Sequence, residues 1–122
     1  MPNLQHIDHV AITVSDLARS EEWYRTVLGL ERRFEMWDEP LMLGAGDTCL
    51  ALFADETKGD RADAPHLLHV AFRVDREGFQ RAQDEFRARG VDFRFSDHGL
   101  AHSVYIKDPD GNRIEITTYE LD

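Results

Sequence analysis

Cysteine is nearly absent from this chain of 122 residues, and its single copy, Cys49, excludes both an internal disulfide framework and a zinc site built from several thiolates. Long hydrophobic runs are missing too, since no stretch approaches the roughly 20 apolar residues that a membrane span needs. The first residues, MPNLQHIDHVAITV, carry neither a basic leader nor a signal-like apolar core. We therefore expect a soluble, unprocessed cytoplasmic protein with no membrane contact.

Positive charge is also scarce: 14 Lys and Arg face 24 Asp and Glu, which gives a formal net charge of −10 at pH 7. A surface of that sign repels the phosphate backbone, so a nucleic-acid partner is excluded. The length is that of one ordinary domain, and it is sufficient to bury a core without cross-links.

The chain does contain an internal repeat. Residues 7–14, IDHVAITV, and 67–74, LLHVAFRV, share His-Val-Ala at a spacing of 60 residues. In both runs apolar residues alternate with the positions of His9 and His69. This alternation predicts two strands that each bury one face and present a histidine on the other.

Helix and strand signals follow in the same order in both halves. One helix should begin after Ser15-Asp16 and end at Gly29, and another should begin after Asp75 and end at Gly90. Three strand-like runs follow each helix, at 31–37, 40–44 and 48–54 and at 91–95, 102–107 and 113–119. The pattern predicts an α+β fold in a single domain over 1–122, with βαβββ modules at about 5–54 and 66–120 and a polar linker at about 55–65.

A module of about 55 residues with one apolar sheet face is marginal by itself. The two sheets should therefore combine, either within the chain or by exchange between chains, and exposed sheet edges favour a homodimer. The sequence leaves open whether His9 and His69 meet within one chain or across two.

Two histidines and one glutamate are the candidate metal ligands. A lone histidine at a strand start is usually a satisfied polar residue, but His9 and His69 occupy the same place in a repeat. Alternation in Ile114-Glu115-Ile116 sends Glu115 to the histidine face. Two neutral imidazoles and a carboxylate leave positions on a metal open for substrate, oxygen or water. The sequence thus predicts one divalent ion held by His9, His69 and Glu115.

A second alignment, at a spacing of 65 residues, sets Gly46 against Gly111 and Leu50 against Glu115. Leu50 is then the fourth position that points to the proposed metal site, after His9, His69 and Glu115. A leucine cannot bind a metal. Alternation turns its neighbour Cys49 towards the helix side, where it is expected to be a core residue.

Tyr105 is the first candidate for proton transfer. Asp-Pro-Asp-Gly at 108–111 reads as a type I turn followed by a left-handed glycine. Counting outward from that hairpin loop places Tyr105 opposite Glu115 and Ser103 opposite Thr117. A phenol on that face can donate a hydrogen bond to a bound oxygen group, or exchange a proton with it.

His98 and His102 lie upstream of Tyr105, and either is a candidate acid or base near neutral pH, although a solvated loop histidine is the commoner case. Arg73 has the parity of the histidine face. It is expected to bind an anionic group of the substrate or to pair with a carboxylate.

Three segments, HIDHVAITVSDLARSEEWYRTVLGLE, HVAFRV and VYIKDPDGNRIEI, resemble the vicinal oxygen chelate superfamily, and the resemblance spans nearly the whole chain. That superfamily includes lactoylglutathione lyases, extradiol ring-cleaving dioxygenases, fosfomycin-inactivating thiol transferases and metal-free drug-sequestering proteins of the bleomycin-resistance type. The resemblance implies paired βαβββ modules that form a cupped mixed sheet around one metal, with His9, His69 and Glu115 at the ligand positions.

Within the superfamily, lactoylglutathione lyases usually place a glutamate at the position matched by Leu50, so their activity is disfavoured. Extradiol dioxygenases look closer, because they use two histidines and a glutamate on iron(II), with a tyrosine ten residues before the glutamate, as Tyr105 precedes Glu115. They also carry an acid-base histidine before the tyrosine, a role for which His98 and His102 compete.

Thiol transferases share the three ligands and a Ser-x-Tyr segment, which is matched by Ser103 and Tyr105, so Ser103 is a candidate substrate-binding residue. Ala11 replaces the hydroxyl residue that they favour, and the chain ends at Asp122 without their arginine-bearing tail. Both departures disfavour a thiol transferase.

The resemblance therefore implies an enzyme that binds a small molecule through vicinal oxygens, most concretely an extradiol-like oxygenase with Fe²⁺ as the favoured metal. The first alternative is a non-redox glyoxalase-like or thiol-transferase-like enzyme on Mn²⁺, Ni²⁺, Zn²⁺ or Co²⁺. The second is a metal-free protein that sequesters a drug-like ligand in an aromatic cavity.

Overall fold

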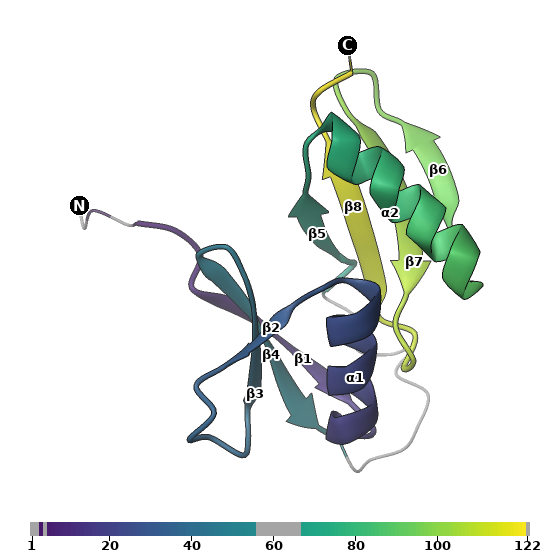
Figure 1. The fold of residues 1–122 in the computed structure, drawn as a ribbon. Coiled ribbons are helices and arrows are strands. Elements are labelled where there is room, and N and C mark those ends of the chain that lie inside the picture. Colours follow the sequence, from purple (N-terminus) through teal and green to yellow (C-terminus); the bar gives the residue numbers. More distant parts are fainter. Residues whose placement is uncertain (1–2, 4, 56–66, 122) are drawn as a thin grey trace. The chain divides into compact units, whose positions relative to one another are not determined.

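The same order of elements occurs twice in the computed structural model, which describes residues 3, 5–55 and 67–121. One copy lies in the unit of residues 1–60 and the other in the unit of residues 61–122. Each copy is a strand, a helix and three further strands (Figure 1), so the predicted α+β fold of two βαβββ modules is confirmed. The predicted linker at 55–65 lies, apart from Asp55, outside the described residues.

The first unit contains one helix and a mixed sheet. Its elements are β1 (His9–Val14), α1 (Leu17–Val27), β2 (Glu31–Arg33), β3 (Leu41–Ala45) and β4 (Thr48–Ala54). The strand order is β1-β4-β3-β2, with β1 parallel to β4 and the other pairs antiparallel. Strand β2 is shorter than the predicted run at 31–37, because Phe34 has a left-handed backbone (φ 54°) and its carbonyl accepts a hydrogen bond from the amide of Trp37.

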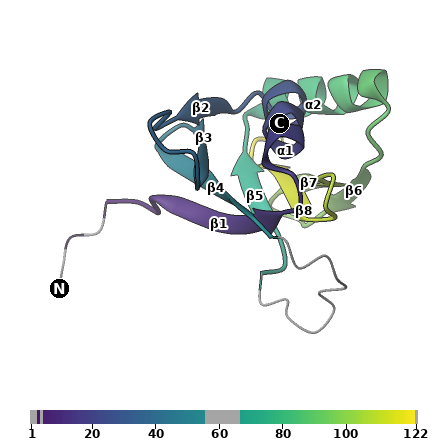
Figure 2. The same ribbon diagram turned by 90° about the horizontal axis from the view of Figure 1, so that it is seen from below.

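The second unit repeats this topology. Its elements are β5 (Val70–Arg73), α2 (Arg76–Arg89), β6 (Arg94–Asp97), β7 (His102–Lys107) and β8 (Arg113–Thr118), and the sheet order is β5-β8-β7-β6. Helix α2 packs against β8 and covers one face of this sheet (Figures 1 and 2).

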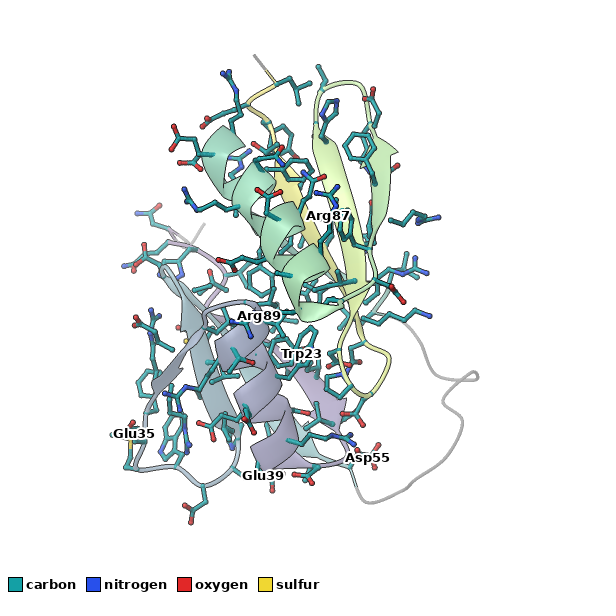
Figure 3. All side chains as sticks on the ribbon, turned by 45° about the vertical axis from the view of Figure 1, so that its right-hand side comes forward. Trp23, Glu35, Glu39, Asp55, Arg87 and Arg89 are labelled. Atoms are coloured by element: carbon teal, nitrogen blue, oxygen red, sulfur yellow. The ribbon has the colours of Figure 1, made fainter. Side chains whose placement is uncertain are left out.

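The helices begin and end where their caps predict. The carboxylates of Asp16 and Asp75 accept hydrogen bonds from the amides of Arg19 and Gly78, at 3.0 and 2.7 Å, and so satisfy free donors of each first turn. Gly90 ends α2 in the left-handed conformation (φ 71°). Arg87 and Arg89 lie in the last turn of α2 (Figure 3), where positive charge favourably opposes the helix dipole. Neither helix has the length and apolarity to cross a membrane.

The expectation that Leu50 shares the face of His9 is wrong. His9 pairs with Cys49, and Val10 pairs with Leu50. Paired residues of neighbouring strands point to the same face, so Cys49 lies on the face of His9 and Leu50 lies on the opposite, helix-covered face. Leu50 is 2% exposed there, beside the fully buried Leu43 with which it also pairs. The expectation that Cys49 faces the helix is wrong for the same reason, although Cys49 is buried.

The two turns explain the error. Strands β3 and β4 are joined by a two-residue turn at 46–47, whereas β7 and β8 are joined by five residues at 108–112. Aligning the turn glycines therefore shifts the register by one residue. In the first unit Ala11, two positions after His9, pairs with Ala51 of β4. In the second unit Ala71, two positions after His69, pairs with Glu115 of β8. Ala51, not Leu50, is the equivalent of Glu115.

The loop at 108–112 has the predicted form. Asp108 and Asn112 pair through a 2.9 Å backbone hydrogen bond, and Gly111 has a φ of 86°. The Oδ1 atom of Asp108 also accepts hydrogen bonds from the amides of Asp110 and Asn112, at 2.9 and 2.8 Å. Since Asp108 is 5% exposed, its carboxylate stabilises the loop that sets the register of Glu115.

Asp108→Ala should lower the free energy of unfolding by about 2 kcal/mol, because two amides lose their acceptor. Urea unfolding followed by circular dichroism measures this change. Asp108→Asn is the matched control, since its amide oxygen still accepts both bonds, and it should cost less. Equal losses for the two variants would show that the acceptor is not what stabilises the loop.

Candidate metal and catalytic site

The second sheet brings two of the three predicted ligands together. The Nε2 atom of His69, just before β5, lies 3.0 Å from the Oε1 atom of Glu115 in β8. Glu115 is 8% exposed, which is rare for a carboxylate unless it is paired. Imidazole and carboxylate are both ligands of divalent metals, so this pair would supply two of the ligands of such an ion.

A buried hydroxyl group, which itself contacts a second one, holds the other oxygen of Glu115. The hydroxyl of Ser103 in β7 donates to Oε2 at 2.7 Å, and Thr117 Oγ1 lies 3.0 Å from Ser103 Oγ. These contacts leave Oε1 directed at His69. Ser103 was a candidate for substrate binding, but the structure buries it completely and places it under the carboxylate. Its contacts suit a residue that positions Glu115.

Tyr105 lies on the same face as Glu115. The two residues pair across β7 and β8, and Ser103 pairs with Thr117, so the register predicted from the loop is confirmed. The Nε2 atom of His98 lies 2.9 Å from the Tyr105 hydroxyl. Burial raises the pKa of Tyr105, and the negative charge of Glu115 and a hydrogen bond to it raise it further. Arg94 and Arg113 partly offset this rise in the pKa.

The two candidate acid-base histidines have different surroundings. His102 pairs with Thr118 and therefore points to the face opposite Tyr105. There its ring contacts Phe95, with 5.1 Å between centroids, and its Nε2 lies 3.6 Å from Asp97 Oδ1. The structure thus brings His98, and not His102, beside Tyr105.

Arg73 lies on the face of Glu115, because it pairs with Thr117 across β5 and β8. Its guanidinium carbon sits 4.4 Å from the centroid of the Tyr119 ring, so a cation–π contact orients the side chain. The charge of this arginine remains available to an anion.

His9 begins β1 in the first unit, on the face opposite Leu50. Its Nδ1 lies 2.9 Å from Asp8 Oδ2, and its side chain is 48% exposed. A carboxylate on one ring nitrogen fixes the tautomer and leaves the lone pair of Nε2 available to a ligand. Across the ranges that the structure describes, no three His, Cys, Asp or Glu side chains form a group that could hold a metal, so the three-ligand site remains a proposal.

Sequence reasoning missed Asp8, Arg94 and Arg113. Asp8 is adjacent to His9, and a carboxylate beside a candidate ligand was the available signal. Arg113 has the parity of Glu115, so alternation along β8 was sufficient to find it. Arg94 could not be identified from the sequence, because the sheet face on which it lies depends on how β6 pairs with β7.

Glu115→Gln should lower the pKa of Tyr105 in the metal-free protein. The substitution removes the negative charge that raises this pKa, while Arg94 and Arg113 still lower it. The absorbance of the phenolate as a function of pH measures the change, with Tyr105→Phe subtracted to assign the signal. An unchanged or higher pKa would show that Glu115 does not act on this phenol.

Comparison with known proteins gives a consistent grouping. A model of the Glyoxalase/Bleomycin resistance protein/Dioxygenase superfamily matches residues 6–116. Glutathione transferase FosA of Serratia marcescens is 29% identical over 93% of this chain and 80% of its own length. Metallothiol transferase FosB of Staphylococcus epidermidis is 28% identical over 94% of the chain and 82% of its own length.

Two further similarities extend the comparison. Catechol-2,3-dioxygenase of Bacillus subtilis is 27% identical over 91% of this chain, which corresponds to 40% of that protein. The structure of a lactoylglutathione lyase from Agrobacterium tumefaciens superposes with a TM-score of 0.74 and 23% identity, covering 96% of both chains. At that identity the superposition shows a shared fold and nothing about activity.

Proposed function

The chain belongs to the glyoxalase/bleomycin resistance protein/dioxygenase superfamily, and we propose that it is a metal-dependent thiol transferase that joins a small-molecule thiol to an electrophilic substrate held by its oxygens. The main support for an enzyme of this kind is the contact between His69 Nε2 and Glu115 Oε1, at 3.0 Å. Glu115 is also the cross-strand partner of Tyr105. The thiol is favoured because the two transferases match over at least 80% of their own length. For this reason we favour the non-redox enzyme, which was the first alternative predicted from the sequence, over the oxygenase.

His9, His69 and Glu115 would hold the metal. Two imidazoles and a carboxylate suit Mn²⁺, Fe²⁺, Co²⁺, Ni²⁺ or Zn²⁺. When bound, the ion would supply Lewis-acid polarisation of a substrate oxygen. Asp8 would fix the tautomer of His9, and Ser103 would fix the orientation of Glu115, so two of the three ligands have an outer partner.

Proton transfer would be the work of Tyr105 and His98. When sulfur bonds to an electrophilic carbon and a carbon–oxygen bond breaks, the thiol loses a proton and the departing oxygen takes up the electron pair. The Tyr105 hydroxyl would donate a hydrogen bond to that oxygen. His98, 2.9 Å from this hydroxyl, would exchange the proton with it.

A ring-cleaving dioxygenase is the second candidate. Its support is the contact between His98 and Tyr105, together with the similarity to catechol-2,3-dioxygenase. It ranks second because this chain corresponds to less than half of that enzyme.

The test compares metals under nitrogen and in air. Protein loaded with Mn²⁺ is incubated anaerobically with glutathione and a panel of epoxides that carry a neighbouring oxygen group, and adducts are measured by mass spectrometry. We expect an adduct from the wild type and from His102→Ala, and none from His69→Ala. A protein that forms no adduct but cleaves catechols with Fe²⁺ and oxygen would reverse the order of the two candidates.

We also propose a homodimer, since each four-stranded sheet has two edge strands, and edge strands can pair with a strand of another chain. Light scattering measures the mass in solution. Mixing His9→Ala with Glu115→Ala then separates two arrangements: activity returns if the ligands come from two chains, and stays absent if they come from one.

A further inference from the structure

Three oxygen-bearing side chains form a buried row on the second sheet. The hydroxyl of Ser103 donates to Oε2 of Glu115 at 2.7 Å, and Ser103 Oγ lies 3.0 Å from Thr117 Oγ1. Ser103 has no exposed surface, and Glu115 and Thr117 are each 8% exposed. Among the residues that the structure describes, no hydrogen bond joins Thr117 to Glu115 directly, so the connection between them runs through Ser103.

Strand register brings these three side chains together. Ser103 pairs with Thr117 across β7 and β8, and Thr117 follows Glu115 by two positions, so all three lie on one face of the sheet. The next residue, Thr118, is 2% exposed and lies on the opposite face, where its hydroxyl accepts a hydrogen bond from the amide of Glu120 at 3.2 Å. Two adjacent buried threonines therefore place the same hydroxyl group on the two faces, and only one of them contacts Ser103.

The distances decide which hydroxyl supplies each hydrogen. A hydroxyl has a single hydrogen, and the 2.7 Å from Ser103 Oγ to Glu115 Oε2 is the length expected when that hydrogen points at a carboxylate. The 3.0 Å contact between the two hydroxyls then needs the hydrogen of Thr117. The other acceptor near Thr117, the carbonyl of His102, is 3.3 Å away, which is beyond the usual range for a hydroxyl donor. Both hydrogens therefore point towards the carboxylate.

A row of this kind strengthens its last hydrogen bond. Hydrogen bonds in a chain polarise one another, so a Ser103 oxygen that accepts a hydrogen from Thr117 is a better donor to Glu115. Without the hydroxyl of Thr117, the oxygen of Ser103 would be a buried acceptor that lacks a donor, and its side chain would lose one of the two contacts that fix its direction. The orientation of the Glu115 carboxylate then depends on Thr117 as well as on Ser103.

We propose that Thr117 is a positioning residue of the metal site: it donates to Ser103, Ser103 donates to Oε2 of Glu115, and Oε1 of Glu115 is thereby kept directed at His69. The inference rests on the proposed function in one respect, which is that Glu115 is a ligand of the metal. Residues that hold a ligand directly usually change the metal affinity by about 10- to 100-fold. Thr117 is one hydrogen bond further from the metal, so its effect should be smaller, about three- to tenfold.

The test is the affinity of the full chain for Mn²⁺, measured by calorimetry without any substrate. Thr117→Val keeps the shape of the side chain but removes the hydroxyl, and it should bind Mn²⁺ about three- to tenfold more weakly than the wild type. Thr117→Ser restores the hydroxyl and should bind as tightly as the wild type. Thr118→Val is the matched control, because it makes the same change at a buried site on the opposite face, and it should also bind as tightly as the wild type.

A double variant tests whether Thr117 acts through Ser103. Since the effect of Thr117 requires the Ser103 hydroxyl, Ser103→Ala combined with Thr117→Val should bind Mn²⁺ as weakly as Ser103→Ala alone and no more weakly. Two independent contributions would instead multiply their losses. Thermal unfolding confirms that each variant is folded, and Thr117→Ala, which removes the same hydroxyl, replaces Thr117→Val if the valine variant does not fold.

Any of three results would overturn the proposal: wild-type affinity in Thr117→Val, equal weakening by Thr118→Val and Thr117→Val, or losses that multiply in the double variant. A wild type that binds no Mn²⁺ overturns it together with the metal site. Failure of the thiol transfer assay is a separate result. If no thiol adduct forms but the Mn²⁺ affinities follow the expected pattern, the role of Thr117 stands and the proposed reaction fails. If adducts form and Thr117→Val binds Mn²⁺ like the wild type, the reaction stands and the role of Thr117 fails.

Discussion

Glu115→Ala should abolish catalysis and weaken the binding of a divalent metal by at least about a hundredfold. The substitution removes a ligand and also leaves His69 and the hydroxyl of Ser103 without the oxygens that they contact at 3.0 and 2.7 Å. Calorimetry with Mn²⁺ measures the affinity, and the adduct assay measures the activity. His102→Ala is the matched control, because that histidine occupies the opposite face of the same sheet.

Ser103→Ala should weaken the binding of the divalent metal less than Glu115→Ala does. Ser103 holds Oε2 of Glu115 but contributes no atom to the metal, and outer partners of this kind usually change the affinity by about 10- to 100-fold. The affinity for Mn²⁺ should decrease in the order wild type, Ser103→Ala, Glu115→Ala. If Glu115→Ala binds Mn²⁺ as tightly as the wild type, Glu115 is not a ligand.

Leu50→Ala should lower the free energy of unfolding by about 3 kcal/mol, because it leaves a cavity beneath α1. Leu50 is 2% exposed and pairs with the fully buried Leu43. Urea unfolding measures the loss. Leu100→Ala, at a site that is 83% exposed, makes the same chemical change and should cost less than about 0.5 kcal/mol.

The contrast between the two leucines also tests the strand register. If Leu50 lay on the same sheet face as His9, its truncation would leave the helix-covered core intact. The free energy of unfolding would then change little. Equal losses for Leu50→Ala and Leu100→Ala would therefore contradict the register in which Ala51 is the equivalent of Glu115.

Local signals predicted most of the fold. The caps Asp16 and Asp75 and the terminal glycines fixed both helices, because their hydrogen bonds form within a few residues of the chain. The loop at 108–112 likewise predicted that Tyr105 pairs with Glu115, since a hairpin register follows from its turn.

The features that failed or stayed open depend on contacts between distant segments. Leu50 was misplaced because two turns of different length were treated as equivalent, and only the parallel pairing of β1 with β4 reveals the shift. The choice between His98 and His102 required the pairing of β7 with β8.

The central claim is that His9, His69 and Glu115 hold one divalent ion, and metal content tests it most directly. Wild type, His9→Ala, His69→Ala, Glu115→Ala and the control His102→Ala are equilibrated with Mn²⁺, and the bound metal is counted by elemental analysis and electron paramagnetic resonance. We predict one ion per chain for the wild type and the control, and strong loss in each of the other three. A wild type that binds no metal, or a His9→Ala variant that keeps a full complement, would contradict the claim.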